Sequence, residues 1–163
     1  MMDREKVFSD IQLYLDQANL AVSNIDMQRP WGGFFVIDER DSEKFIEHFF
    51  PDLNKAELLK GKLSPKMLLV APQKKLSWQY HFRRSEVWKL IKGEAAVVTS
   101  DNDIENETTF LKRGDTITLK KGERHRLVGL NEWGIVAEIW IHTDANNPSD
   151  EEDIVRLQDD FGR

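Results

Sequence analysis

The chain has 163 residues, the length of one ordinary domain, and 40% of them are hydrophobic while 32% are charged, a balance typical of a folded globular protein. Its formal net charge of −6 at pH 7 disfavours a nonspecific binder of nucleic acid or of anionic membranes. The sequence has no cysteine, which excludes disulfides, thiolate nucleophiles and cysteine-based zinc sites and is typical of a reducing cytoplasm.

The amino-terminal region is charged and amphipathic. Apolar side chains recur at helical spacing over residues 3–22, which predicts a first helix within an N-terminal helical segment, residues 1–26. The sequence lacks an apolar signal-peptide core and any run of roughly 18 apolar residues. We therefore expect a cytoplasmic protein without a membrane partner.

A helical insertion is predicted over residues 41–65, after a strand at Gly33–Asp38. Its main helix is expected at Ser42–Phe50, where Pro51 marks the end, and a turn or short helix is expected at Asn54–Leu59. We interpret all of these segments as parts of a single domain, residues 1–163.

Short β-rich runs separated by glycine-containing turns fill residues 66–142. Many short strands with closely spaced turns are typical of a β-sandwich or barrel. The predicted strands are Met67–Val70, Ser77–Phe82, Val87–Ile91, Ala95–Thr99, Thr108–Leu111, Asp115–Leu119, His125–Val128 and Ile135–Ile141. In the tail, residues 149–163, the acidic run Ser149–Asp153 is interpreted as a helix entrance or a solvated loop before Ile154–Phe161. Arg156 is expected either to cap a pocket or to pair with nearby acids.

Four side chains form a candidate metal site. Gln79 and His81 lie two residues apart on a predicted strand, so both point to the same face. Glu86 follows across a short turn, and His125 opens a distant strand. Two imidazoles, one carboxylate and one amide oxygen suit a divalent cation such as zinc, manganese, iron, cobalt or nickel. The competing interpretation is that each histidine is only a hydrogen-bonded structural residue.

Several blocks of sequence together resemble the cupin domain of type II phosphomannose isomerases (mannose-6-phosphate isomerases). They are Arg29-Pro30-Trp31-Gly32, Leu76–Trp88 followed by Gly93, Leu111–Asp115, Lys121–Leu127, Glu151–Arg156 and Asp159–Arg163. The resemblance implies a mainly β fold, a double-stranded β-helix or jelly-roll barrel, with the N-terminal helix and the helical insertion added to it. It also implies one bound divalent metal ion, for which zinc is the first choice.

The same resemblance implies a metal-dependent aldose–ketose isomerase that acts on a sugar phosphate such as mannose 6-phosphate. Arg84 and Arg126 each lie near a ligand in sequence and are candidates to meet the phosphate or the developing negative charge, although either could form a surface ion pair. Lys89 and Trp140 are further candidates for lining the pocket. The proton-transfer base is either a metal-bound hydroxide or Glu138.

Two departures from the family pattern keep other functions open. Val87 stands where the family usually has histidine, and Gln73 stands near a position where glycine is expected. One alternative is therefore a noncatalytic metal cupin that binds a sugar or another metabolite, and another is a different cupin enzyme, an epimerase or an iron oxygenase. By analogy with other small cupins we expect a homodimer.

Overall fold

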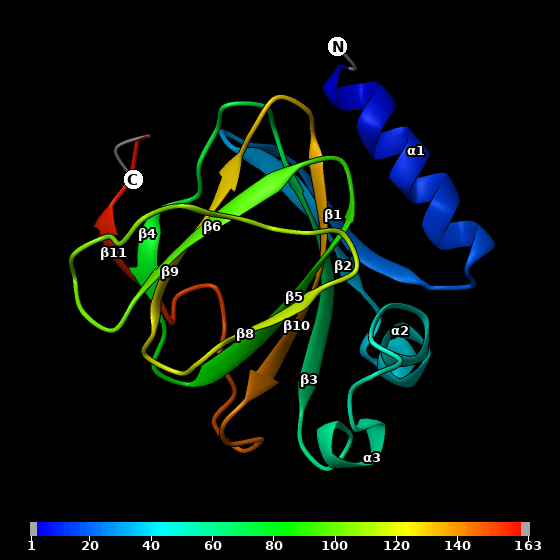
Figure 1. The fold of residues 1–163 in the computed structure, drawn as a ribbon. Helices are drawn as coiled ribbons and strands as arrows, with labels where there is room; N and C mark the ends of the chain where they lie inside the picture. Colours follow the sequence, from blue (N-terminus) through cyan, green and yellow to red (C-terminus); the bar gives the residue numbers. More distant parts are fainter. Residues whose placement is uncertain (1–2, 161–163) are drawn as a thin grey trace.

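Two antiparallel β-sheets that face each other form the centre of the protein in the computed structural model, which describes residues 3–160 (Figure 1). The six-stranded sheet has the order β1-β2-β3-β10-β5-β8 and the five-stranded sheet the order β11-β4-β9-β6-β7. The strands of the first sheet are β1 (Val22–Arg29), β2 (Gly32–Ile37), β3 (Leu63–Val70), β5 (Arg84–Lys92), β8 (Thr116–Leu119) and β10 (Gly134–His142). Those of the second are β4 (Trp78–Tyr80), β6 (Ala95–Ser100), β7 (Thr109–Phe110), β9 (Arg124–Gly129) and β11 (Val155–Gln158). The predicted mainly β architecture with two packed sheets is confirmed.

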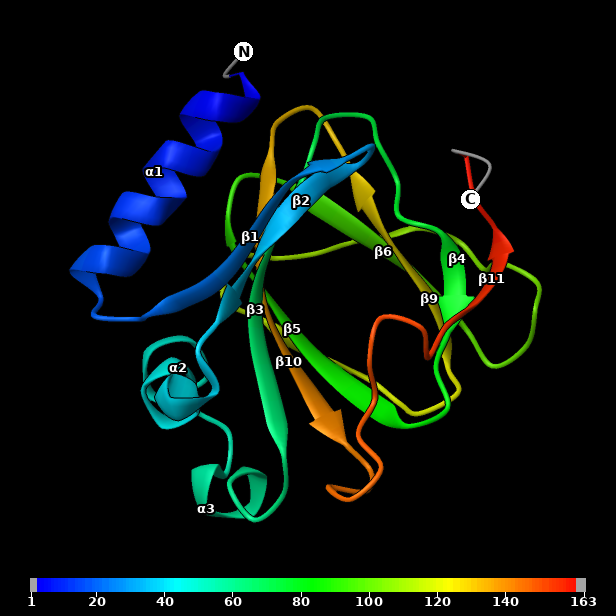
Figure 2. The same ribbon diagram turned by 180° about the vertical axis from the view of Figure 1, so that it is seen from behind.

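Helices cover the outer face of the six-stranded sheet (Figures 1 and 2). They are α1 (Arg4–Gln17), the short 3-10 helix η1 (Glu39–Asp41), α2 (Ser42–Phe49) and α3 (Lys55–Leu58). Leu15 of α1 and Phe45 of α2 are fully buried in one apolar cluster with Met67 of β3. The predicted insertion helices at residues 42–50 and 54–59 are thus confirmed. No helix within residues 3–160 is long and apolar enough to span a membrane.

The six-stranded sheet is buried on both faces, and alternate side chains serve different purposes. On β3, Met67 and Leu69 pack beneath the helices, whereas Lys66 and Leu68 face the second sheet. A strand buried on both sides has an almost continuous apolar sequence. The outer face therefore carries a largely apolar core, while the inner face can carry polar groups.

The amino-terminal segment is helical over a shorter range than residues 1–26. The side chain of Asp3 accepts a hydrogen bond from the backbone N–H of Lys6 and caps α1. The helix ends at Gln17, and Asn19 adopts a left-handed conformation with φ of 58°. The next residues form β1, an edge strand in which half of the residues are exposed and none is fully buried, so it lacks the apolar alternation by which a strand is recognised.

The acidic run Ser149–Asp153 is a loop in which Asp150, Glu151 and Glu152 are exposed, in agreement with the second of its two interpretations. A strand, and not a helix, follows it. β11 pairs with β4, so that Arg156 lies opposite Gln79. The last residues of the predicted tail, 161–163, lie outside the described residues. The predicted insertion, residues 41–65, also overlaps a strand, because β3 begins at Leu63.

Replacing Gly93 with alanine is expected to destabilise the fold. Gly93 lies in the turn between β5 and β6 with φ of 74°, and an added Cβ would lie 1.8 Å from the carbonyl oxygen of Trp133. We expect a loss of about 2 kcal/mol or more in the free energy of unfolding, measured by urea denaturation. The control is Gly61→Ala, where an added Cβ meets nothing within 4 Å. Equal stability of the two variants would contradict this account.

Candidate metal centre

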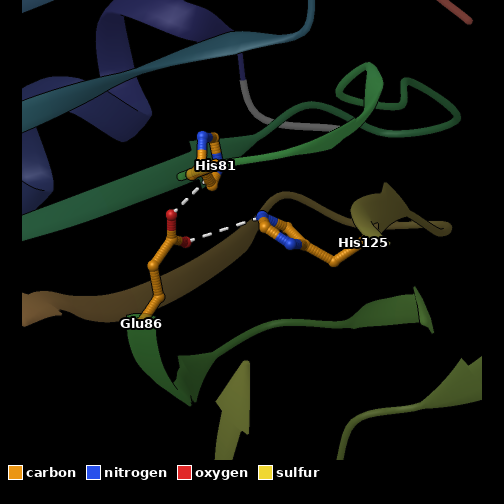
Figure 3. Close-up of side chains that lie close together, drawn as sticks. All are labelled: His81, Glu86 and His125. Carbon is orange, nitrogen blue, oxygen red and sulfur yellow. Dashed lines mark ion pairs between the residues drawn. The ribbon is translucent and has the colours of Figure 1, made fainter. Parts of the chain in front are cut away.

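Three buried side chains from the two sheets converge on one point (Figure 3). Glu86 comes from β5, His125 from β9, and His81 directly follows β4. The Nε2 atom of His81 lies 3.3 Å from Oε2 of Glu86, and Nε2 of His125 lies 3.7 Å from Oε1. Ligand atoms around one tetrahedral zinc ion lie roughly 3.4 Å apart, given metal–ligand distances of about 2.1 Å. The cluster could therefore hold a metal ion.

Strand pairing explains this convergence. Gln79 of β4 lies directly opposite His125 of β9, so their side chains share a face, and His81 is two residues beyond Gln79. On β5, Glu86 alternates with Val87, which packs against the helices, so Glu86 points toward the second sheet. The two histidines and the carboxylate thus meet between the sheets.

Backbone carbonyls determine which nitrogen of each imidazole carries the proton. The Nδ1 atom of His81 lies 2.7 Å from the carbonyl oxygen of Asp153, and Nδ1 of His125 lies 3.1 Å from that of Glu123. A carbonyl oxygen can only accept, so each Nδ1 must donate. Each Nε2 is then left with a lone pair that points toward Glu86, the orientation that a metal-binding imidazole requires.

The protonation states also suit a cation. Burial lowers the pKa of His81 to about 4, although the charge of Glu86 partly opposes this effect. Burial alone would raise the pKa of Glu86, but the Arg84 guanidinium and the two imidazoles hold it below its usual range. At neutral pH the site therefore offers a neutral His81 and an ionised Glu86, the forms that metal binding requires.

Two hydrogen-bonding features test whether a metal fits. The Nε2 atom of His125 is buried without a hydrogen-bond partner among the described residues, and its lone pair faces a carboxylate. An unsatisfied buried acceptor is costly, and a cation between the two groups would satisfy both. Arg84 donates from Nε to Oε2 of Glu86 (2.8 Å) and from Nη2 to Nε2 of His81 (3.1 Å). Metal binding thus requires Arg84 to release His81, whose single lone pair cannot serve both.

Gln79 lies beside this cluster but already has a partner. Its side chain is buried and lines the same cavity as Glu86. Its Oε1 atom accepts a hydrogen bond of 3.0 Å from the hydroxyl of Ser77, which leaves a second lone pair free. Its role as a fourth ligand stays a prediction.

A cavity of about 70 Å³ opens beside the cluster, and its walls are rich in cations. The cationic residues that line it are Arg29, Lys66, Arg84 and Arg156. Sequence reasoning missed Arg29 and Lys66. A lysine next to the apolar run Met67–Val70 was the available signal, because a strand that is otherwise apolar rarely carries a charge without a partner.

Glu138 of β10 lies in this cavity as a buried carboxyl group. Trp88 Nε1 donates to its Oε2 atom at 2.7 Å, and Trp140 Nε1 donates to its Oε1 atom at 3.0 Å. Burial and the neighbouring charge of Glu86 raise the pKa of Glu138 well above its usual value. The carboxyl group therefore retains a proton and forms a hydrogen bond with Glu86.

The predicted residues Arg84 and Trp140 both lie at the cavity. The guanidinium of Arg84 stacks 3.6 Å from the centre of the Trp140 ring. Its Nη1 atom also donates to the hydroxyl of Ser149 and to the carbonyl oxygen of Asp150. Arg84 is thereby held between the metal cluster and the carboxyl-terminal tail.

The structure does not bring Lys89 and Arg126 to this cavity. Each follows an inward-facing residue by an odd number of positions along its strand, so its side chain points to the opposite face. Lys89 contacts Asp52 at 3.4 Å near the Phe50 ring. Arg126 donates to the carbonyl oxygen of Leu76 and pairs with Glu105.

Comparison with known proteins places this chain in a family. Residues 54–159 match the sequence profile described as mannose-6-phosphate isomerase C-terminal. A mannose-1-phosphate guanylyltransferase of Sinorhizobium fredii is 30% identical over 132 residues, which cover 81% of this chain and 20% of that protein. The alginate biosynthesis protein AlgA of Pseudomonas aeruginosa is 27% identical over 144 residues, 86% of this chain and 24% of that protein. The chain thus spans only about a quarter or less of these relatives.

Solved structures share the fold. Hazelnut (Corylus avellana) vicilin has a TM-score of 0.56 at 16% identity, covering 85% of this chain and 36% of that one. An oxalate oxidase solved with glycolate has a TM-score of 0.54 at 17% identity, covering 81% of this chain and 58% of that one. The predicted cupin fold is confirmed.

We expect the purified protein to bind one divalent ion per chain, because the cluster offers two imidazole lone pairs and a charged carboxylate. Glu86→Gln and His125→Asn should each weaken binding by about 100-fold or more, since each removes a ligand. Titration calorimetry of chelator-treated protein with zinc, cobalt and manganese measures this. His48→Asn, at an exposed position on α2, is the control. Undiminished binding by both cluster variants would exclude the site.

The metal-free protein should lose stability in mild acid. The pKa of His81 is about 4 in the fold and about 6.5 in the unfolded chain, so the unfolded chain binds more protons between these values. Stability from this residue is complete above pH of about 6.5 and is lost as pH falls toward 4, by about 3 kcal/mol in total. Urea denaturation across this range, with chelator present, measures the loss. His81→Asn should flatten the dependence and His48→Asn should not; equal slopes in all three proteins would refute the assignment.

Proposed function

We propose that this chain, which belongs to the mannose-6-phosphate isomerase C-terminal family, is a metal-dependent isomerase. Its substrates would be an aldose phosphate and a ketose phosphate of the mannose 6-phosphate and fructose 6-phosphate type. One observation carries the proposal: a buried His-Glu-His cluster adjoins a cavity lined by four cationic side chains. The first feature suits a cation, and the second suits a phosphorylated ligand.

His81, Glu86 and His125 would hold the metal, with Gln79 as a fourth ligand. When bound, the ion would act as a Lewis acid toward the oxygens on the first two carbons of the sugar. The imidazole tautomers fixed by Asp153 and Glu123 keep the lone pairs ready for it. Arg84, released from His81, still contacts Glu86 and the tail and can donate to the developing negative charge.

Glu138 is the proposed proton carrier. Isomerisation moves one proton from C2 of the aldose to C1, and the hydroxyl proton moves from O2 to O1, so no oxidant or reductant is needed. A carboxyl group with a raised pKa is a strong base once it is ionised. A cation held by Glu86 would cancel the neighbouring negative charge that helps to keep Glu138 protonated, so Glu138 would become available as a base when the metal is bound. The indole N–H groups of Trp88 and Trp140 hold this carboxyl group in place.

Charge favours an anionic substrate over a neutral one. Arg29, Lys66, Arg84 and Arg156 contribute four positive charges to the lining. The acidic residues Glu86, Glu138 and Glu151 also line it, but Glu138 retains its proton. The surplus of positive charge would attract a phosphate group despite the net negative charge of the chain.

A second candidate function is binding without turnover, and the size of the cavity favours it. The volume of about 70 Å³ is far below the roughly 300–1,000 Å³ of typical small-molecule sites. Catalysis would thus require the cavity to open. Val87, in contrast, gives this candidate no support, because its side chain packs beneath the helices and not in the cavity.

An isomerase assay separates the two functions. The metal-loaded protein should convert mannose 6-phosphate to fructose 6-phosphate, and activity should vanish with chelator and return with metal. Glu138→Gln should lower kcat by about 100-fold or more, because it removes the proton carrier. Lys89→Met, on the opposite face of β5, should retain activity. Tight binding of the sugar phosphate without turnover would establish the binding-only function, and oxygen consumption by iron-loaded protein would favour an oxygenase.

A further inference from the structure

Lys66 is a buried cation on an interior strand. It lies on β3, opposite Glu138 of β10, and its side chain is only 7% exposed. Its Nζ atom lies 3.6 Å from the centre of the Trp140 ring and 4.9 Å from that of Phe34. Aromatic faces stabilise a cation only partly, so a buried ammonium group still requires an anion.

The anion is supplied by the tail. Glu151 Oε1 lies 2.8 Å from Nζ of Lys66. Glu138 lies opposite Lys66 on the neighbouring strand, but its two carboxyl oxygens accept hydrogen bonds from the indole N–H groups of Trp88 and Trp140. Among the described residues, Glu151 is thus the carboxylate in direct contact with Lys66.

This ion pair is strongly asymmetric. The side chain of Glu151 is 58% exposed, against 7% for Lys66. The exposed carboxylate can turn into water and remain hydrated. Lys66 cannot, so any departure of Glu151 leaves a buried charge that another anion would neutralise.

The position of the Glu151 carboxylate is favourable for an anion in general. Partial burial would raise the pKa of Glu151, yet Lys66, Arg84 and Arg29 together hold it below its usual range. The rings of Phe34 and Trp140 separate these three cations: Arg29 and Lys66 lie over Phe34, and Lys66 and Arg84 lie over Trp140. Three positive groups therefore act on one point at the edge of the cavity.

The tail does not depend on Glu151 for its attachment. The carboxylate of Asp153 accepts hydrogen bonds from the backbone N–H groups of Phe82 and Arg83 and from the hydroxyl of Ser149. Arg84 binds Ser149 and the carbonyl oxygen of Asp150. These bonds lie on both sides of Glu151, so its side chain can leave Lys66 while the backbone stays in place.

We propose that Lys66 is the phosphate anchor of the cavity and that the Glu151 carboxylate is an internal substitute, which the phosphate of the ligand displaces. This inference rests on the proposed function in taking a sugar phosphate as the ligand. A phosphate offers more acceptor oxygens and more charge than one carboxylate, so it competes favourably for Lys66. Displacement would also enlarge the cavity where Glu151 lines it.

Calorimetric binding of mannose 6-phosphate, of unphosphorylated mannose and of inorganic phosphate tests the proposal. Glu151→Gln should tighten binding of the two phosphate-containing probes by about tenfold, because the competing charge is gone, and Lys66→Met should weaken it by about tenfold or more. Mannose binding should change with neither. Glu152→Gln, an exposed neighbour, is the control and should behave as the wild type.

The outcomes separate this inference from the isomerase proposal. Binding that follows the expected pattern without turnover would uphold the phosphate anchor and remove the isomerase. Turnover with unchanged affinities in Lys66→Met and Glu151→Gln would remove the anchor alone. If Lys66→Met fails to fold, Lys66→Arg should retain phosphate binding. The affinity of Glu151→Gln for the two phosphate-containing probes then tests the inference. Absence of phosphate binding by Glu151→Gln overturns the inference.

Discussion

The contact between Glu86 of one sheet and the imidazoles of His81 and His125 on the other is the interaction on which the candidate site depends. It exists only because both sheets hold the correct register: Gln79 lies opposite His125, and Glu86 lies opposite Trp140. A shift of one residue in either sheet would turn these side chains to the opposite face. Burial then fixes the protonation states, since it keeps His81 neutral while Arg84 keeps Glu86 ionised.

The carboxyl-terminal tail completes this site instead of only covering it. The backbone carbonyl of Asp153 accepts the Nδ1 proton of His81 and so directs its Nε2 lone pair toward Glu86. The carboxylate of the same residue binds the chain just beyond His81, at Phe82 and Arg83. One tail residue thus fixes both the tautomer of a metal-binding histidine and the turn that follows it.

Strand alternation, with its two-residue period, predicted that Gln79 and His81 share a face. The resemblance to a family of metal cupins predicted the two-sheeted fold and the convergence of His81 with Glu86 and His125. The same period explains the failures. Arg126 was chosen for its closeness in sequence to a ligand and Lys89 as a residue that could line the pocket, and strand alternation turns both away from the cavity. Lys66 was missed although it is a charged residue beside an apolar run, because its partner Glu151 is 85 residues away in the sequence. Edge strands such as β1 and β11 escaped recognition because pairing with a neighbour, and not their own apolar pattern, defines them.

The two faces of the six-stranded sheet differ: the outer face packs apolar side chains against the helices, and the inner face carries the charged groups. This difference explains how one small domain accommodates so much buried charge. Ion pairs such as Arg84–Glu86 bring desolvation costs that can exceed their attraction, and the unpartnered Nε2 of His125 adds to that cost. The outer face offsets it with a continuous apolar cluster that includes Leu15, Phe45 and Met67. A substitution on that outer face, such as valine for histidine at position 87, changes the packing beneath the helices and not the chemistry of the cavity. A residue that differs from the family pattern on a strand of this sheet therefore bears on the chemistry of the cavity where its side chain points between the two sheets.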